Sequence, residues 1–291
     1  ARLTDTKPAA TSSGAGGAVP RSLCVNFDFS DDQRLLQDAV RTMLADTSTS
    51  QAVREVLEGR ASHSETVWRN LIEMGAAAAA VPEQYGGAGL GYLELCLVAE
   101  EAGRHLAAVP LASSFYLAAE AILRAGSEVQ KQHWLPKIAR GEVVATAALG
   151  NRERYRAPAP LTFDGVTLSG TSPALGDGGI AGLAVLRVGD QLVLVDLAGA
   201  GLSRKSLPTL DPTRPLAELH FDHTPAEALG AANGAAIAPR VVDGAAVLLA
   251  FEQVGGAARI LEATRDYSLE RKAFGRQIGS FQAMKHKMAE I

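Results

Sequence analysis

The sequence lacks the residues that mark a secreted, metal-binding or nucleic-acid-binding protein. Its 291 residues include two cysteines, Cys24 and Cys96, which are too few for a disulfide framework, and no CxxC pair of the kind that binds metal. It also has no dense run of basic residues, because 28 lysines and arginines stand against 32 acidic residues for a net charge of -4. This balance argues against nucleic acid as a partner.

Long hydrophobic runs are missing as well. The longest apolar stretches, near residues 76–81 and 245–251, are much shorter than the roughly 20 residues that a membrane-spanning helix needs. Residues 1–24 lack the apolar centre of a signal peptide. We therefore expect a cytoplasmic protein that is not attached to a membrane.

Motifs for the common catalytic and binding sites are not found either. The segment YGGAGLGY (85–92) lacks the spacing of a dinucleotide-binding loop and is interpreted as a tight turn. His220 and His223 alternate on a predicted strand, but a metal site would need a third and a fourth ligand that the sequence does not offer. We interpret them as polar positions on a solvated sheet face, and no metal site is predicted.

After a polar leader, the sequence falls into three regions that differ in their pattern of apolar residues. Together they predict an α+β protein of several domains. Residues 1–25 are rich in Ala, Gly, Ser and Thr and are expected to be disordered. Residues 26–142 predict an N-terminal all-α domain. Residues 143–237 predict a middle domain built from an antiparallel β-sheet or barrel, and residues 238–291 predict the incomplete start of a C-terminal helical bundle.

The helical segments carry their own boundary signals. Ser30 can cap a first helix, whose apolar stripe is Leu35, Leu36, Val40 and Leu44. Later helices are predicted from SETVWRNLIEMGA, GYLELCLVAEEAGRHLA, SFYLAAEAILRAG and EVQKQHWLPKIARG, and one of thirty residues or more begins near residue 238. The predicted strands are GVTLSG, LAVLRV, QLVLVDL and LAELHF.

Three blocks of sequence resemble the acyl-CoA dehydrogenase family, whose members use FAD. They are VPEQYGGAGLGYLELCLVAEEAGR (81–104), EVQKQHWLPKIARGE (128–142) and VGGAARILEATRDYSLERKAFGRQIGSFQAMKHKMAEI (254–291). The blocks occur in family order, and the resemblance covers roughly residues 26–291. It implies FAD-dependent α,β-dehydrogenation of an acyl-CoA thioester, with an electron-accepting flavoprotein as a partner.

The resemblance assigns a role to two residues of the last block. In the family, the Arg of an R-x-x-F-G motif reaches the FAD pyrophosphate of a neighbouring subunit, and the Phe lies near the adenine; the matching residues are Arg271 and Phe274. A guanidinium fork suits phosphate oxygens, and an aromatic ring packs on a purine. The family makes no comparable demand on Arg276. The implied assembly is a homo- or hetero-oligomer.

The flavin-ring contacts of the family are not matched. The family Thr that contacts the flavin pyrimidine falls on Gly150, and a Trp and a Thr that pack on the isoalloxazine ring fall on Ala174 and Gly176. The resemblance therefore implies that this subunit has lost the side chains that contact the flavin ring in the family.

The catalytic base is not matched either. In a minority of the family the base lies 26 residues before the motif Arg, which is Ala245 here (271 − 26 = 245); Asp243 and Glu252 are the nearest carboxylates and are out of register. In many members the base lies in the C-terminal helical region, and we expect that this region of the natural protein extends beyond the 291 residues. The catalytic residue is therefore left unknown.

Three functions stay open from the sequence. The first is an FAD-dependent acyl-CoA dehydrogenase, and the second is a non-catalytic partner subunit of a heteromeric enzyme of this family. The third is a scaffold-only structural or CoA-ester-binding protein. Acyl chain length and a steroid or linear substrate cannot be distinguished.

Overall fold

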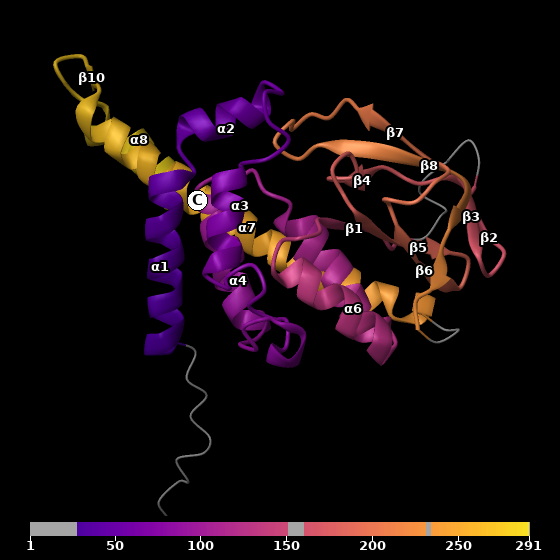
Figure 1. The fold of residues 1–291 in the computed structure, drawn as a ribbon. Coiled ribbons are helices and arrows are strands. Elements are labelled where there is room, and N and C mark those ends of the chain that lie inside the picture. The colour runs from indigo at the N-terminus through magenta and orange to yellow at the C-terminus, as the bar shows by residue number, and fades with distance from the viewer. Residues whose placement is uncertain (1–27, 151–159, 231–233, 291) are drawn as a thin grey trace, which may run out of the picture.

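The computed structural model describes residues 28–150, 160–230 and 234–290, so the predicted leader, 1–25, lies outside the described residues. Helices come first, strands follow, and a long helix with a short one ends the described chain, in the predicted order (Figure 1). The N-terminal helices are α1 (Asp31–Thr47), α2 (Ser50–Leu57), α3 (Glu65–Glu73), η2 (Glu83–Tyr85), α4 (Tyr92–Arg104), η3 (Ala112–Ala119), α5 (Glu120–Ala125) and α6 (Glu128–Ala139).

The first helix begins as its sequence predicts. The Ser30 side chain accepts a hydrogen bond from the Gln33 backbone N–H at 3.2 Å, and the Gln33 side chain accepts one from the Ser30 N–H at 2.9 Å, which is a reciprocal capping box. Of the predicted stripe, Val40 and Leu44 are fully buried, whereas Leu35 is 67% exposed. Leu35 therefore lies outside the face of α1 that is buried.

Two sheets make up the middle of the chain. One has the order β1 (Ala145–Ala148), β5 (Leu183–Val188), β6 (Gln191–Asp196), β9 (Glu227–Ala228), and the other has the order β2 (Thr162–Phe163), β3 (Thr167–Thr171), β8 (Leu216–Pro225), β4 (Leu175–Gly176), with β7 (Leu202–Leu207) also paired to β8. Pairing is antiparallel as predicted except between β1 and β5, which run parallel. The parallel pair arises because β1 enters from the helical region, so its partner β5 is not a hairpin neighbour.

The predicted long helix is confirmed as α7 (Ala238–Glu270), 33 residues long after the short helix η5 (Gly234–Ala236). It packs mainly along α4. A Cβ added at Gly103 would lie 1.9 Å from the Glu252 carbonyl oxygen, and one added at Gly255 would lie 1.9 Å from the Glu100 carbonyl oxygen. The two backbones approach so closely that only glycine fits at these crossings.

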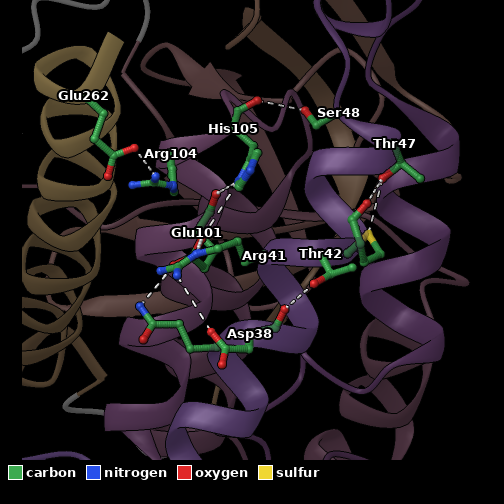
Figure 2. Close-up of polar contacts among 11 residues, drawn as sticks. Asp38, Arg41, Thr42, Thr47, Ser48, Glu101, Arg104, His105 and Glu262 are labelled. Atoms are coloured by element: carbon green, nitrogen blue, oxygen red, sulfur yellow. Dashed lines mark hydrogen bonds and ion pairs between the residues drawn. The ribbon is translucent and has the colours of Figure 1, made fainter. Parts of the chain in front are cut away.

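Buried charges tie the helices around this contact (Figure 2). The Glu101 carboxylate is fully buried and accepts hydrogen bonds from Arg41 Nε at 3.0 Å, from Arg41 Nη2 at 2.7 Å and from Gln37 Nε2 at 3.0 Å. These hydrogen bonds to Glu101 raise the pKa of Arg41. Arg104, one turn on, pairs with Glu262 of α7. The end of α7 is thereby fixed to α4, and α4 to α1.

Helix α7 leads into a short antiparallel hairpin of β10 (Lys272–Ala273) and β11 (Arg276–Gln277), followed by η6 (Ile278–Ser280) and α8 (Gln282–Ala289). The hairpin projects from the helical region at the end away from the two sheets (Figure 1). In the described part of the chain, α7 alone is long and apolar enough to cross a membrane by length and composition. Helix α7 packs on α4 along one side, but only 28% of its most apolar stretch is buried, so the expectation that the protein is not attached to a membrane stays a prediction.

Candidate functional site

A cavity of about 330 Å³ lies where η3, the end of β1, the residues before β4 and the first half of α7 meet. This volume lies within the range of small-molecule sites in proteins. Its lining consists of Ala112, Tyr116, Leu117, Ala147, Ala148, Leu149, Gly150, Pro173, Ala174, Val242, Ala245, Ala246 and Leu249.

The cavity brings together three residues that are far apart in the sequence and were singled out there. Gly150 follows β1, Ala174 precedes β4, and Ala245 lies two turns into α7, yet all three line the same space. Gly176 is not among the lining residues. It belongs to β4, where its carbonyl oxygen accepts a hydrogen bond from Thr146 Oγ1 at 2.7 Å.

The side chains that line the cavity are almost all apolar. Tyr116 carries the one polar side chain among the described lining residues, and none of them is acidic. The Tyr116 hydroxyl is fully buried and lies near the Glu252 carboxylate, but it makes no hydrogen bond of normal geometry within the described residues. Burial, followed by the negative charge of Glu252, raises the pKa of Tyr116 well above its usual value, so the phenol stays protonated.

Tyr116 lies on an unusual element. Residues Ala112–Ala119 form a π-helix, a geometry that is often found at functional sites. Two serines of this helix make hydrogen bonds to neighbouring segments. The Ser113 hydroxyl donates to Asp177 Oδ2 at 2.6 Å, and the Ser114 hydroxyl donates to the Ala145 carbonyl at 3.1 Å. Burial raises the pKa of Asp177. The π-helix is thus hydrogen-bonded to strand β1 and to the turn after β4 at the wall of the cavity.

The two carboxylates nearest to Ala245 in the sequence do not line the cavity. Asp243 is exposed on α7. Glu252 is 7% exposed and is paired with Arg214, which precedes β8. The structure therefore places neither carboxylate in the space that holds Ala245.

This side-chain set does not fit the flavin ring that the family resemblance implies. The pyrimidine edge of a flavin carries several hydrogen-bonding atoms, and a buried polar edge needs partners. Gly150 and Ala174 have no side-chain donor or acceptor, and the Tyr116 hydroxyl is a single group. The described walls of the cavity therefore offer a flavin ring few side-chain contacts.

The other two predicted residues lie at a separate place, on the projecting hairpin. Arg271 is the exposed residue that ends α7, and Phe274 is 95% exposed in the hairpin loop. Within the described residues Arg271 has no acidic side chain at ion-pair distance. A free guanidinium beside an uncovered aromatic ring fits the phosphate and purine parts of a nucleotide that another molecule would bring.

The two histidines that the sequence analysis considered lie on β8. His220 and His223 are both exposed on β8; His220 Nδ1 lies 3.0 Å from Thr171 Oγ1, and His223 Nδ1 lies 2.9 Å from Asp222 Oδ1. No group of three or more potential metal ligands occurs among the described residues.

Sequence reasoning did not single out Tyr116, Arg214 or the π-helix. SFYLAAEAILRAG has ordinary helical spacing, and a π-helix has no composition signal of its own. The one available sign was a tyrosine among small apolar residues, which is also common in cores.

Comparisons with known proteins agree with this architecture. Residues 30–142 match the family model for the acyl-CoA dehydrogenase N-terminal domain, and residues 232–291 match that for the C-terminal domain. The acyl-CoA dehydrogenase IpdE2 of Mycobacterium tuberculosis is 33% identical over 262 residues, which is 90% of this chain and 71% of that protein.

Two solved structures are similar over most of the chain. A variant of the Tcur3481-Tcur3483 steroid ACAD has a TM-score of 0.78 and 34% identity, covering 89% of this chain and 72% of that chain. The ChsE4-ChsE5 complex from Mycobacterium tuberculosis has a TM-score of 0.79 and 27% identity, covering 91% and 74%.

Proposed function

Because this chain belongs to the acyl-CoA dehydrogenase family, we propose that it is a subunit of an oligomeric, FAD-dependent enzyme that dehydrogenates an acyl-CoA thioester. In this proposal the chain supplies Arg271 and Phe274 to FAD that a neighbouring subunit holds, and its own cavity does not carry out the reaction. The observation that carries the proposal is the cavity itself, which gathers Gly150, Ala174 and Ala245 without a carboxylate among its described lining residues.

The chemistry explains why these three residues matter. The reaction removes an α-proton with a general base while a hydride leaves the β-carbon, and FAD supplies the hydride acceptor when it is bound. The methyl group of Ala245 cannot accept a proton. Gly150 and Ala174 cannot orient a flavin ring through their side chains. The cavity of this subunit thus lacks a base and side-chain ring contacts in its described walls.

The hairpin supports the other half of the proposal. Arg271 and Phe274 are exposed. The hairpin that carries Phe274 and follows Arg271 projects from the end of α7, away from the two sheets (Figure 1). A fork of guanidinium donors can bind two phosphate oxygens at once, and the aromatic ring can cover an adenine. Their position favours a cofactor in a second subunit over one in the same subunit.

The similar solved structures support a heteromeric assembly. Two of them are named as pairs of different proteins, Tcur3481-Tcur3483 and ChsE4-ChsE5. We therefore propose a hetero-oligomer in the cytoplasm, in which a catalytic subunit passes electrons to an electron-accepting flavoprotein. The first of these structures is a steroid ACAD by name, which favours a CoA thioester of a steroid-derived acid over a linear fatty acyl-CoA.

The second candidate is a chain that is itself the dehydrogenase. It is favoured by the cavity volume of about 330 Å³ at the junction of η3, β1 and α7, which is large enough for a small ligand. In that case the base must come from residues other than the described walls of the cavity.

The flavin absorbance spectrum separates these functions. We expect the purified chain to be colourless alone and to co-purify with FAD when it is expressed with a catalytic subunit of the family. Stoichiometric FAD in the chain alone would support the self-sufficient enzyme. A lack of FAD in every combination would support a scaffold-only protein and refute the proposal.

A further inference from the structure

The loop of the β10–β11 hairpin holds an aromatic residue in a costly backbone conformation. Phe274 and Gly275, the two loop residues, have φ angles of 53° and 79°, the pattern of a type I′ turn. Glycine adopts this conformation easily, but a bulky side chain rarely does. Such strain persists only where the surrounding structure determines it. The ring that is held in this way is also 95% exposed.

One later residue, Phe281, contacts the Phe274 ring directly, and Arg276 contacts Phe281 in turn. The Phe274 ring meets the Phe281 ring edge to face, with centroids 6.2 Å apart and planes at 82°. The guanidinium carbon of Arg276 lies 4.1 Å from the centroid of the same Phe281 ring. We call these three side chains, Arg276, Phe281 and Phe274, the hairpin stack.

Contacts with the end of α7 fix the backbone that carries the hairpin stack. The backbone N–H of Ile278 donates to the Arg271 carbonyl at 2.8 Å, so the strand that carries Arg276 is bonded to the residue that ends α7. A Cβ added at Gly279 would lie 2.8 Å from Ser268 Oγ, which shows how closely η6 sits against α7. Within the described residues Arg276 has no acidic side chain at ion-pair distance. Its guanidinium is therefore available to the ring.

We propose that Arg276 is a positioning residue, which stacks on Phe281 and thereby holds Phe274 in the pose that meets the adenine of the neighbouring subunit's FAD. This inference rests on the proposed function, because it takes Phe274 and Arg271 as the contacts to FAD. Arg276 acts through the ring of Phe281, on which a planar guanidinium packs over a wider area than an ammonium group does, so a positive charge alone gives a weaker contact.

The chain offers a matched control for this requirement. Lys272 lies on the paired strand of the same hairpin, is exposed, and faces Gln277 across the pair. Lys272→Ala removes one positive charge from the hairpin but leaves the hairpin stack intact. Arg276→Lys does the reverse, because it keeps the charge and removes the planar group.

The test has two readouts on the same four proteins: wild type, Arg276→Ala, Arg276→Lys and Lys272→Ala. Fluorine NMR of protein labelled with 4-fluorophenylalanine, with signals assigned through Phe274→Leu and Phe281→Leu, reports the hairpin stack without any cofactor. Titration of FAD into the assembly reports the consequence. Arg276→Ala should shift the Phe274 and Phe281 signals and weaken FAD binding about two- to fivefold, the size of an exposed cation–π contact. Arg276→Lys should do the same to a smaller extent, because an ammonium group still attracts the ring. Lys272→Ala should change neither.

The two readouts separate failure of the inference from failure of the proposed function. Unchanged Phe274 signals in Arg276→Ala, or an equal loss of FAD affinity in Lys272→Ala, would overturn the inference while Arg271→Ala still lowers affinity. If Arg276→Lys bound FAD as wild type does, charge would be sufficient and the stacking role would be wrong. If Arg271→Ala changed nothing, the proposed function would be refuted, and the role of Arg276 with it.

Discussion

The cavity and the hairpin lie toward opposite ends of α7, and they differ in the groups that they present. Ala245 near the start of the helix faces a cavity walled by mostly apolar side chains, whereas Arg271, which directly follows the helix, and Phe274 in the hairpin loop are exposed. Under the proposed function, the positions that would contact the subunit's own cofactor hold glycine and alanine, whereas Arg271 and Phe274 would contact a cofactor in another subunit. The proposal therefore makes the role of this chain depend on an assembly.

The largest expected effect concerns activity. The 291-residue chain purified alone should show no acyl-CoA dehydrogenation in a dye-reduction assay, even with added FAD, because general-base help of about 10²–10⁴ in rate is missing at Ala245. Ala245→Glu should give a trace of activity if flavin is bound. Robust turnover by the unmodified chain would show that its own cavity is catalytically competent, and the proposed difference between the cavity and the hairpin would be wrong.

Arg271→Ala should weaken FAD retention of the assembly by about one to two powers of ten. A charge-assisted hydrogen bond to phosphate contributes on the order of 1.5–3 kcal/mol. Equilibrium dialysis against FAD measures the change, and Arg276→Ala, which is also exposed on the hairpin, should have the smaller effect. Equal loss in both variants would contradict the assignment of Arg271.

Gly103→Ala should destabilise the whole fold, because the added methyl would lie 1.9 Å from the Glu252 carbonyl of α7. Overpacking of this kind costs about 1–3 kcal/mol, measured by urea unfolding. Gly256→Ala is the matched control, since its Cβ would meet only the Gly103 carbonyl at 3.5 Å and alanine is the better helix former. Similar stability in the two variants would mean that α4 and α7 do not pack this closely.

The smallest effect is expected at Tyr116. Tyr116→Phe removes a buried hydroxyl that has no partner within the described residues, so the protein should be as stable or up to about 1 kcal/mol more stable. Tyr85→Phe should instead lose stability, because that hydroxyl donates to Glu128 at 3.0 Å. A thermal melt of both variants checks this. Marked destabilisation by Tyr116→Phe would show that the hydroxyl is hydrogen-bonded, with the nearby Glu252 carboxylate as the candidate partner.

The sequence predicted the order of helices and strands well because each element carries a local signal. Ser30 with Gln33 encodes a capping box, and the apolar spacing after residue 238 encodes a long helix. The exposed position of Leu35 and the parallel pairing of β1 with β5 depend on which elements meet in space. No local pattern contains that information.

The candidate site was predictable only through the family resemblance. Gly150, Ala174 and Ala245 carry no chemistry that a pattern could detect, and the fact that they share one cavity is a property of the fold. The link from Arg276 through Phe281 to Phe274 likewise depends on the turn geometry of the hairpin. The assignment of Gly150, Ala174 and Ala245 to a flavin site stays a prediction.

The central claim is that this chain serves a flavin that it does not hold by itself. The most direct measurement is the FAD content per chain of three preparations: the chain alone, its assembly with a catalytic subunit, and the same assembly carrying Arg271→Ala in this chain only. We predict no FAD in the first, FAD in the second and a large loss in the third. FAD bound to the chain alone, with no loss on Arg271→Ala in the assembly, would contradict the account.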